Sequence, residues 1–155
     1  MEIALQLTDN ASLRGMEGED GKLYISVYDF INFVTGHERG NAYARMTFQR
    51  LIKEGSQYAS EVVTNCYNLK FNGSGEKETP TMTIRALQRL LMILGGKVAA
   101  EFRAIVESVF TRYIAGDTSL VEEVRANAAS DAPGHVMARK ALEQEPVQLG
   151  KRTRE

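Results

Sequence analysis

Gly95, Gly96 and Lys97 are residue types found where a backbone loop binds phosphate. A phosphate-binding loop also requires a glycine five residues before its Gly-Lys pair and a Ser or Thr after the lysine. Leu91 and Val98 occupy these two positions. The two glycines are therefore interpreted as a tight corner between two helices.

Residues that bind metals or act as nucleophiles are few. His37 and His135 are the only histidines, and neither belongs to a metal-ligand pattern. Cys66 is the only cysteine, so no internal disulfide can form, which is typical of an intracellular protein. Cys66 is predicted to be a small, half-buried strand residue, and no cofactor or metal is expected.

Acidic side chains do not form a recognisable catalytic group. Asp29 and Glu38 bracket a short helix, and Glu76 and Glu78 belong to a loop. A nuclease needs carboxylates that converge on a metal ion, and this spacing does not predict such a cluster. The chain is expected not to be an enzyme, and phosphoryl transfer is the alternative with the least support.

Charge is distributed unevenly along the 155 residues. Residues 37–103 carry 10 basic and 6 acidic side chains, whereas residues 1–36 carry 2 and 6, and residues 104–155 carry 7 and 8. The net charge of the whole chain is only -1. Because a nucleic-acid surface depends on local charge, the basic middle indicates contact with a polyanion.

The predicted contact with DNA, which is favoured over RNA, combines two groups of residues. Asn, Gln and Arg on one helix offer the donors and acceptors that read base edges in a major groove. Other cations would neutralise phosphates. An amphipathic helix whose outer face is merely solvated is the alternative interpretation. The helix group is Arg39, Asn41, Arg45, Gln49, Arg50 and Lys53, and the phosphate group is Lys70, Lys77, Arg85, Arg89 and Lys97.

Hydrophobic periodicity predicts an α+β fold: a small antiparallel sheet with several packed helices and a C-terminal helix–corner–helix. Ile3–Leu7 is expected to pair with Leu23–Val27, and a polar tip at Asn72–Gly75 joins a strand over 66–71 to a returning arm at 80–83. Helices are expected from Val27 to Gly36, from residue 39 to Gly55, over 84–94, over 97–115 ending at Gly116, and from Leu120 after a cap at Asp117, Thr118 or Ser119.

Residues 1–128 are predicted to form one domain. Residues 129–155 contain two prolines and no sustained apolar stripe, which is typical of a flexible tail or a linker stub. The most apolar stretch, over 84–94, is much shorter than the roughly 20 residues that cross a bilayer. We expect a protein that is neither secreted nor bound to a membrane.

The expected helix over 97–115 has an unusually broad apolar stripe. It spans more of the circumference than one packing face needs, which predicts an interface. An oligomerisation or adaptor domain, including a possible homodimer, is therefore the alternative function, and it is compatible with DNA binding. The expected interface residues are Val106, Val109, Phe110, Tyr113 and Ile114.

The order of elements resembles the Bro-N domain, the N-terminal module of baculovirus BRO proteins and phage antirepressors, and more loosely the KilA-N domains of large DNA viruses. The resemblance covers about residues 18–117 and is carried by "YISVYDFINFVTG", "FQRLIKEG" and "TIRALQRLLMILGGKVAAEFRAIVESVFTRYIAGD". Asp29 matches the aspartate of the family's early helix, and Phe102 matches the phenylalanine of its last signature. The resemblance implies a DNA-binding, possibly regulatory module of viral or mobile-element origin, located in the host nucleus or cytoplasm.

Overall fold

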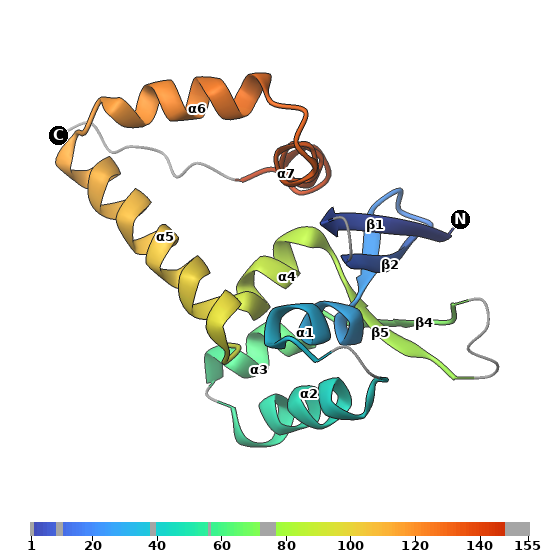
Figure 1. Cartoon of the computed structure of the whole chain (residues 1–155). Helices are drawn as coiled ribbons and strands as arrows, with labels where there is room; N and C mark the ends of the chain where they lie inside the picture. Colours follow the sequence, from blue (N-terminus) through green and yellow to red (C-terminus); the bar gives the residue numbers. More distant parts are fainter. Residues whose placement is uncertain (1, 9–10, 38–39, 56, 72–76, 148–155) are drawn as a thin grey trace, which may run out of the picture.

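A computed structural model shows an α+β fold, in which a small antiparallel sheet packs against helices (Figure 1). It describes residues 2–8, 11–37, 40–55, 57–71 and 77–147. In chain order the elements are β1 (Glu2–Thr8), β2 (Ala11–Glu17), β3 (Leu23–Ser26), α1 (Val27–Thr35), α2 (Ala42–Glu54), α3 (Gln57–Thr64), β4 (Tyr67–Leu69), β5 (Thr79–Met82), α4 (Ile84–Leu91), α5 (Lys97–Ala115), α6 (Ser119–Ala129) and α7 (Pro133–Gln144).

The described part of the sheet has five strands in the order β1-β2-β3-β5-β4, and every neighbouring pair is antiparallel. β1 pairs with β2, and β2 pairs with β3, which corrects the expected direct pairing of the first and third strands. The β2 sequence, ASLRGME, alternates apolar and polar residues only over its first four positions, and its glycine and charges resemble a loop. It is extended because neighbouring strands flank it on both sides and complete its backbone hydrogen bonds.

The β4–β5 hairpin lies at one edge of the sheet. Tyr67 is opposite Thr81, and the Thr81 hydroxyl donates to the Tyr67 carbonyl oxygen at 2.7 Å. The strand over 66–71 is thus shorter than expected, and the returning arm begins one residue earlier than expected. The expected tip at Asn72–Gly75 lies outside the described residues.

The predicted bounds of α1, from Val27 to the glycine at position 36, are confirmed, and the structure adds a cap at its start. The Ser26 hydroxyl accepts a hydrogen bond from the Asp29 backbone N–H at 3.2 Å and so caps the first turn. Gly36 ends the helix with φ at 76°, a left-handed conformation that glycine adopts without steric cost. Ile31 and Val34 then face the core.

A short helix, α3, follows α2 and is not among the expected elements. Gly55 ends α2 as expected, but its backbone is extended rather than left-handed, with φ at -72°. A Cβ atom placed on Gly55 would lie 2.7 Å from the Ala59 Cβ and would also overlap the Leu51 carbonyl oxygen. Gly55 is therefore required by the close approach of α2 and α3, and not by its own torsion angles.

Gly55→Ala is expected to lower the free energy of unfolding by about 1–3 kcal/mol, because the added methyl group overpacks the α2–α3 turn. Gly95→Ala is the matched control, since its Cβ would meet nothing within 4 Å. Urea denaturation measures both variants. Equal stability of the two would contradict the packing role of Gly55.

The core lies between the sheet and helices α1 and α4. Ile25, Ile31, Met82 and Leu90, from β3, α1, β5 and α4, are among the largest side chains that are fully buried. α4 begins at Thr83, whose hydroxyl accepts from the Ala86 backbone N–H at 3.4 Å.

Gly95 and Gly96 form the corner between α4 and α5, as the sequence predicts. Gly96 immediately precedes α5 and has φ at 98°, which disfavours any residue with a side chain. Lys97 is an exposed first-turn residue of α5.

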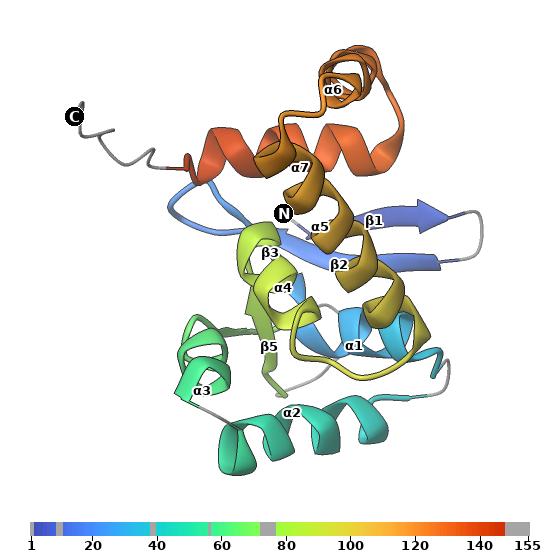
Figure 2. The ribbon, with the colours of Figure 1, turned by 90° about the vertical axis from the view of Figure 1, so that its left-hand side faces the viewer.

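The last three helices form an arch that leaves the body of the protein and returns to it (Figures 1 and 2). Within α5, only Ala99 is buried, and α6 contains no buried residue. α7 returns to the body: its Ala141 is buried, and the Gln144 side chain accepts from the Leu23 backbone N–H at 3.0 Å.

The flexible tail expected over 129–155 is wrong for much of its length. Residue 129 is the last residue of α6, and Pro133–Gln144 form helix α7. α7 docks through the buried Ala141, through Met137, which is partly buried against the core, and through hydrogen bonds, including that from the Arg85 guanidinium to the Glu145 carbonyl oxygen at 2.9 Å. Two apolar residues one turn apart are too short a pattern to predict a helix from the sequence. Residues 148–155 lie outside the described residues.

Among the described residues, no helix combines the length and the apolar character required to cross a membrane.

Candidate nucleic-acid interface

Helix α2 turns an apolar side to the body and a basic side to solvent. Ala44 and Phe48 are buried, and the Phe48 ring packs edge-on against Tyr28 of α1, with centroids 6.4 Å apart. α-Helical spacing turns other positions of α2 away from α1 and toward solvent. We use the name α2 face for its exposed polar residues, Arg45, Gln49, Arg50 and Lys53. Tyr43, Met46 and Ile52 are apolar residues exposed on the same helix.

The α2 face carries three cations, and none of them forms an ion pair with another described residue. Arg45, Gln49 and Lys53 recur every four residues, so they lie along one line on the helix. Their donors are therefore available to an external acceptor.

A polar cleft of about 630 Å³ opens at the beginning of α2. It brings together elements that are far apart in the sequence: β2, α1, α2 and β5. Two residues of the predicted helix group, Asn41 and Arg45, line the cleft beside Lys77 of the predicted phosphate group. The described residues that line the cleft are Arg14, Tyr28, Asn41, Arg45, Lys77, Glu78 and Thr79.

Arg14 is a cleft residue that the sequence did not single out. Its backbone N–H and its Nε atom each donate to one Asp29 oxygen at 2.9 Å, and its Nη2 atom donates to the other at 2.9 Å. The guanidinium also lies over the Phe71 ring, 5.0 Å from the centroid. Asp29 therefore compensates the charge of Arg14 and ties β2 to the first turn of α1.

Asp29→Asn is expected to lower the free energy of unfolding by about 1.5–3 kcal/mol, the range for a hydrogen bond to a charged group. The amide removes the negative charge and one of the two acceptor oxygens of a carboxylate that is largely buried. Asp131→Asn, at an exposed position before α7, is the control and should change stability by less than about 0.5 kcal/mol. If urea denaturation gives the same stability for both variants, the Arg14–Asp29 pair does not stabilise the fold.

The remaining predicted phosphate contacts lie on other elements. Arg85 and Arg89 belong to α4, which lies away from the end of the molecule formed by α2 (Figure 2). The Arg85 guanidinium is already bonded to backbone oxygens of Glu145 and Pro146. Lys97 lies 3.9 Å from the Glu101 carboxylate. Lys70 is exposed after β4, and Arg39 lies outside the described residues.

The described residues contain no group of three or more His, Cys, Asp or Glu side chains placed to hold a metal ion. His37 stacks on Tyr43 with ring centroids 3.6 Å apart. Cys66 is half-buried, and this burial raises the pKa of its thiol. A higher pKa lowers the fraction of the thiol that is present as the reactive thiolate.

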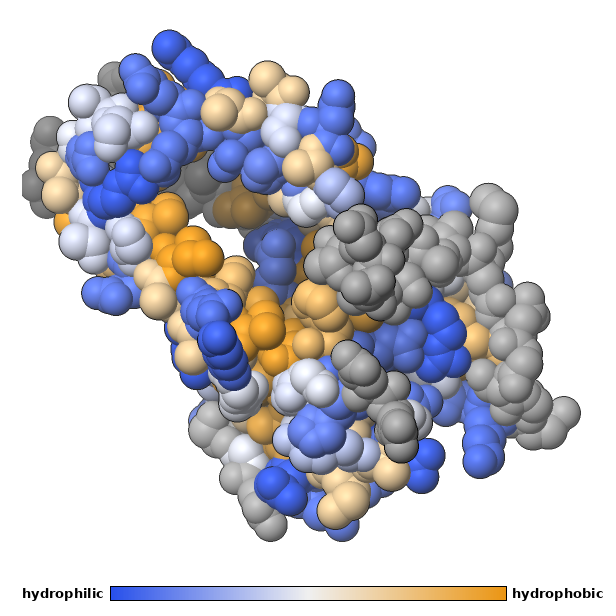
Figure 3. Space-filling view, viewed as in Figure 1, coloured by the Kyte–Doolittle hydropathy of each residue, from blue (hydrophilic) through white to orange (hydrophobic). Residues whose placement is uncertain are grey.

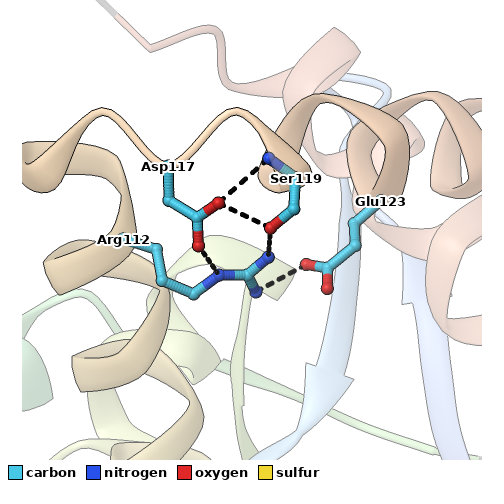
Figure 4. Close-up of polar contacts among 4 residues, drawn as sticks. All are labelled: Arg112, Asp117, Ser119 and Glu123. Atoms are coloured by element: carbon cyan, nitrogen blue, oxygen red, sulfur yellow. Dashed lines mark hydrogen bonds and ion pairs between the residues drawn. The ribbon is translucent and has the colours of Figure 1, made fainter.

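The corner between α5 and α6 is fixed by a polar network around Arg112 (Figure 4). The Arg112 guanidinium donates to Asp117 at 3.1 Å, to Glu123 at 2.8 Å and to the Ser119 hydroxyl at 3.0 Å. Hydrogen bonds from the Ser119 hydroxyl and backbone N–H, together with Arg112, lower the pKa of Asp117. Of the three expected caps of α6, Thr118 holds the cap position without a side-chain bond, and Asp117 accepts from Ser119 instead.

The apolar residues predicted for an interface are all exposed on α5. Their surface continues into an apolar pocket of about 500 Å³ at the α5–α6 corner, where Tyr113 lies with Val121 and Val124. In Figure 3, hydrophobic surface borders the opening between this part of the arch and the body. The expected interface residues therefore belong to one apolar surface, and Val121 and Val124 of α6 enlarge that surface.

Comparisons of this chain with protein-family models, with curated proteins and with solved structures gave no match.

Proposed function

We propose that this protein is a non-enzymatic DNA-binding module that contacts duplex DNA through the α2 face and the adjoining cleft. The observation that carries the proposal is the convergence of Asn41, Arg45 and Lys77 at one cleft, from segments more than thirty residues apart. The resemblance of residues 18–117 to Bro-N domains supports the same function.

The residue types on this surface suit two kinds of contact. Gln49 carries an amide that bonds to an adenine edge in the major groove. Arg50 and Lys53 suit phosphate oxygens, which position a protein without reading sequence. Phosphate contacts outnumber base contacts on such a surface, so the proposed binding is tolerant of sequence or only modestly specific.

The cleft is suited to one backbone phosphate rather than to a base. Arg45 and Lys77 provide cations at its rim, and Asn41 adds an amide donor. Among the described lining residues, Glu78 is the only carboxylate, while Asp29 holds Arg14 in place from outside the lining. An anion that enters the cleft therefore meets two cations that have no ion-pair partner among the described residues.

Fluorescence anisotropy with a labelled random-sequence duplex, at several salt concentrations, tests the proposal. About three or four neutralised phosphates predict that log K falls with log salt concentration with a slope of about -3. A single strand and a duplex RNA of equal length are the comparison ligands, and both are expected to bind more weakly. Absence of duplex binding at low salt would overturn the proposal, and stronger binding of RNA would reassign its ligand.

A further inference from the structure

Helix α5 exposes more apolar surface than an isolated chain ordinarily leaves in water. Seven large apolar side chains of α5 are exposed, with exposed fractions that range from 36% for Val106 to 66% for Ile114. On α6, Val121 and Val124 add 49% and 58%. Contiguous apolar surface of this kind marks an interaction site rather than a solvated face.

Six apolar residues of α5 form one side of the helix, because they recur at steps of three or four positions. Phe102 is half-buried, and the other five are exposed. We call this set the α5 stripe: Phe102, Ile105, Val106, Val109, Phe110 and Tyr113.

The α5 stripe is symmetric under reversal of the helix. Reversal about the point between Glu107 and Ser108 exchanges Val106 with Val109. The same reversal exchanges Ile105 with Phe110, and Phe102 with Tyr113. A two-fold axis at this point therefore places each residue of the stripe against another apolar residue of the stripe, because contacts in a two-fold interface are reciprocal.

We infer that two copies of this chain pair through α5, antiparallel, around a two-fold axis that passes between Glu107 and Ser108. Val106 of each copy then packs against Val109 of the other, and aromatic and aliphatic side chains meet on either side. The pocket at the α5–α6 corner extends the contact, since Tyr113 belongs both to the stripe and to the pocket lining.

The available area agrees with a second copy as the occupant. A stable interface of ordinary size takes about 800 Å² from each partner. The α5 stripe, together with Ile114, Val121 and Val124, offers large apolar side chains about half exposed, which is an area of that order. The chemistry on both sides is identical and apolar, so no complementary charge on a different partner is needed.

The dimer and the proposed DNA contact are independent. α2 lies at one end of the molecule and α6 at the other, so pairing through the arch leaves the α2 face open (Figures 1 and 2). Either property can therefore fail in an experiment without the other.

Sedimentation velocity of the full chain tests the pairing. The wild-type chain is expected to sediment as a dimer at micromolar concentration, and Val109→Glu is expected to raise the dimer dissociation constant by about a hundredfold or more, because it places two unpaired carboxylates beside the axis. Thr111→Glu is the matched control: it adds the same charge on the opposite side of α5 and should leave the dimer intact.

Val109 is 41% exposed, so Val109→Glu should keep the wild-type circular dichroism spectrum and melting temperature at concentrations where both chains are monomeric. A wild-type chain that stays monomeric at about 100 micromolar would overturn the inference. A dimer that persists in folded Val109→Glu would overturn it as well.

Spin-label distances decide the orientation of the two helices. Labels are placed at Ala100→Cys or Glu107→Cys, each exposed on α5 and away from the α5 stripe, in a Cys66→Ser chain. Antiparallel pairing separates the two labels at position 100 by about 22 Å along the helix axis, whereas those at position 107 lie nearly level with each other. Equal distances at the two positions would indicate parallel helices and would overturn the proposed axis.

Discussion

The double variant Arg45→Glu, Arg50→Glu is expected to bind duplex DNA about a hundredfold more weakly than the wild-type chain. Each substitution removes a cation from the α2 face and places a carboxylate opposite a phosphate or a base edge. A loss of about 1–3 kcal/mol per contact and a factor of ten per 1.4 kcal/mol give this magnitude. The salt slope should also become shallower by about two, because two phosphates are no longer neutralised. Anisotropy titrations against one duplex measure both quantities.

The charge-matched control for this double variant is Arg125→Glu, Lys140→Glu. Both residues are exposed on α6 and α7, at the end of the molecule away from α2, and the change in net charge is identical. If binding depends only on overall charge, the two double variants will lose the same affinity. The assignment to α2 fails if a folded Arg45→Glu, Arg50→Glu chain keeps wild-type affinity.

Leu90→Ala is expected to lower the free energy of unfolding by about 2–5 kcal/mol. Leu90 lies on the buried side of α4 and has no exposed surface. Truncation leaves a cavity where α4 packs toward the sheet, and the loss is comparable to the whole stability of many small domains. Equilibrium denaturation in urea measures the effect, with Leu90→Met expected to lose less than about 1.5 kcal/mol because it conserves volume.

Ile52→Ala provides the contrast for the core prediction. Ile52 is 51% exposed on α2, so its truncation should change stability by no more than about 0.5 kcal/mol. A large loss at Ile52, or none at Leu90, would contradict the placement of the core between the sheet, α1 and α4.

The sequence predicted those features that depend on neighbours along the chain. The cap at Ser26, and the left-handed glycines Gly36, Gly96 and Gly116, lie at helix ends that the pattern predicted. Each is determined within a few residues, because capping and glycine torsion angles are local requirements. The basic outer side of α2 follows from the same local periodicity.

Features stabilised by distant contacts were not predicted. β2 is extended because two other strands bond to it, and α3 packs on α2 through a close approach at Gly55. α7 is held by the burial of Ala141 and by hydrogen bonds that Leu23 and Arg85 donate to Gln144 and Glu145. Each segment carries only a short apolar pattern, such as Ala59, Val62 and Val63 in α3, and the contacts that stabilise it come from residues far away in the sequence.

For the candidate site, the sequence by itself determined which residues are basic and which side of α2 faces outward. Only the tertiary structure placed Lys77 beside Asn41 and Arg45, assigned Arg14 to Asp29, and engaged Arg85 with the end of the chain. Helical periodicity is a property of adjacent residues, so a sequence displays it directly. Contacts between segments that are far apart in the sequence depend on how the whole core packs. The spacing of residues along the chain does not show which distant segments will lie together.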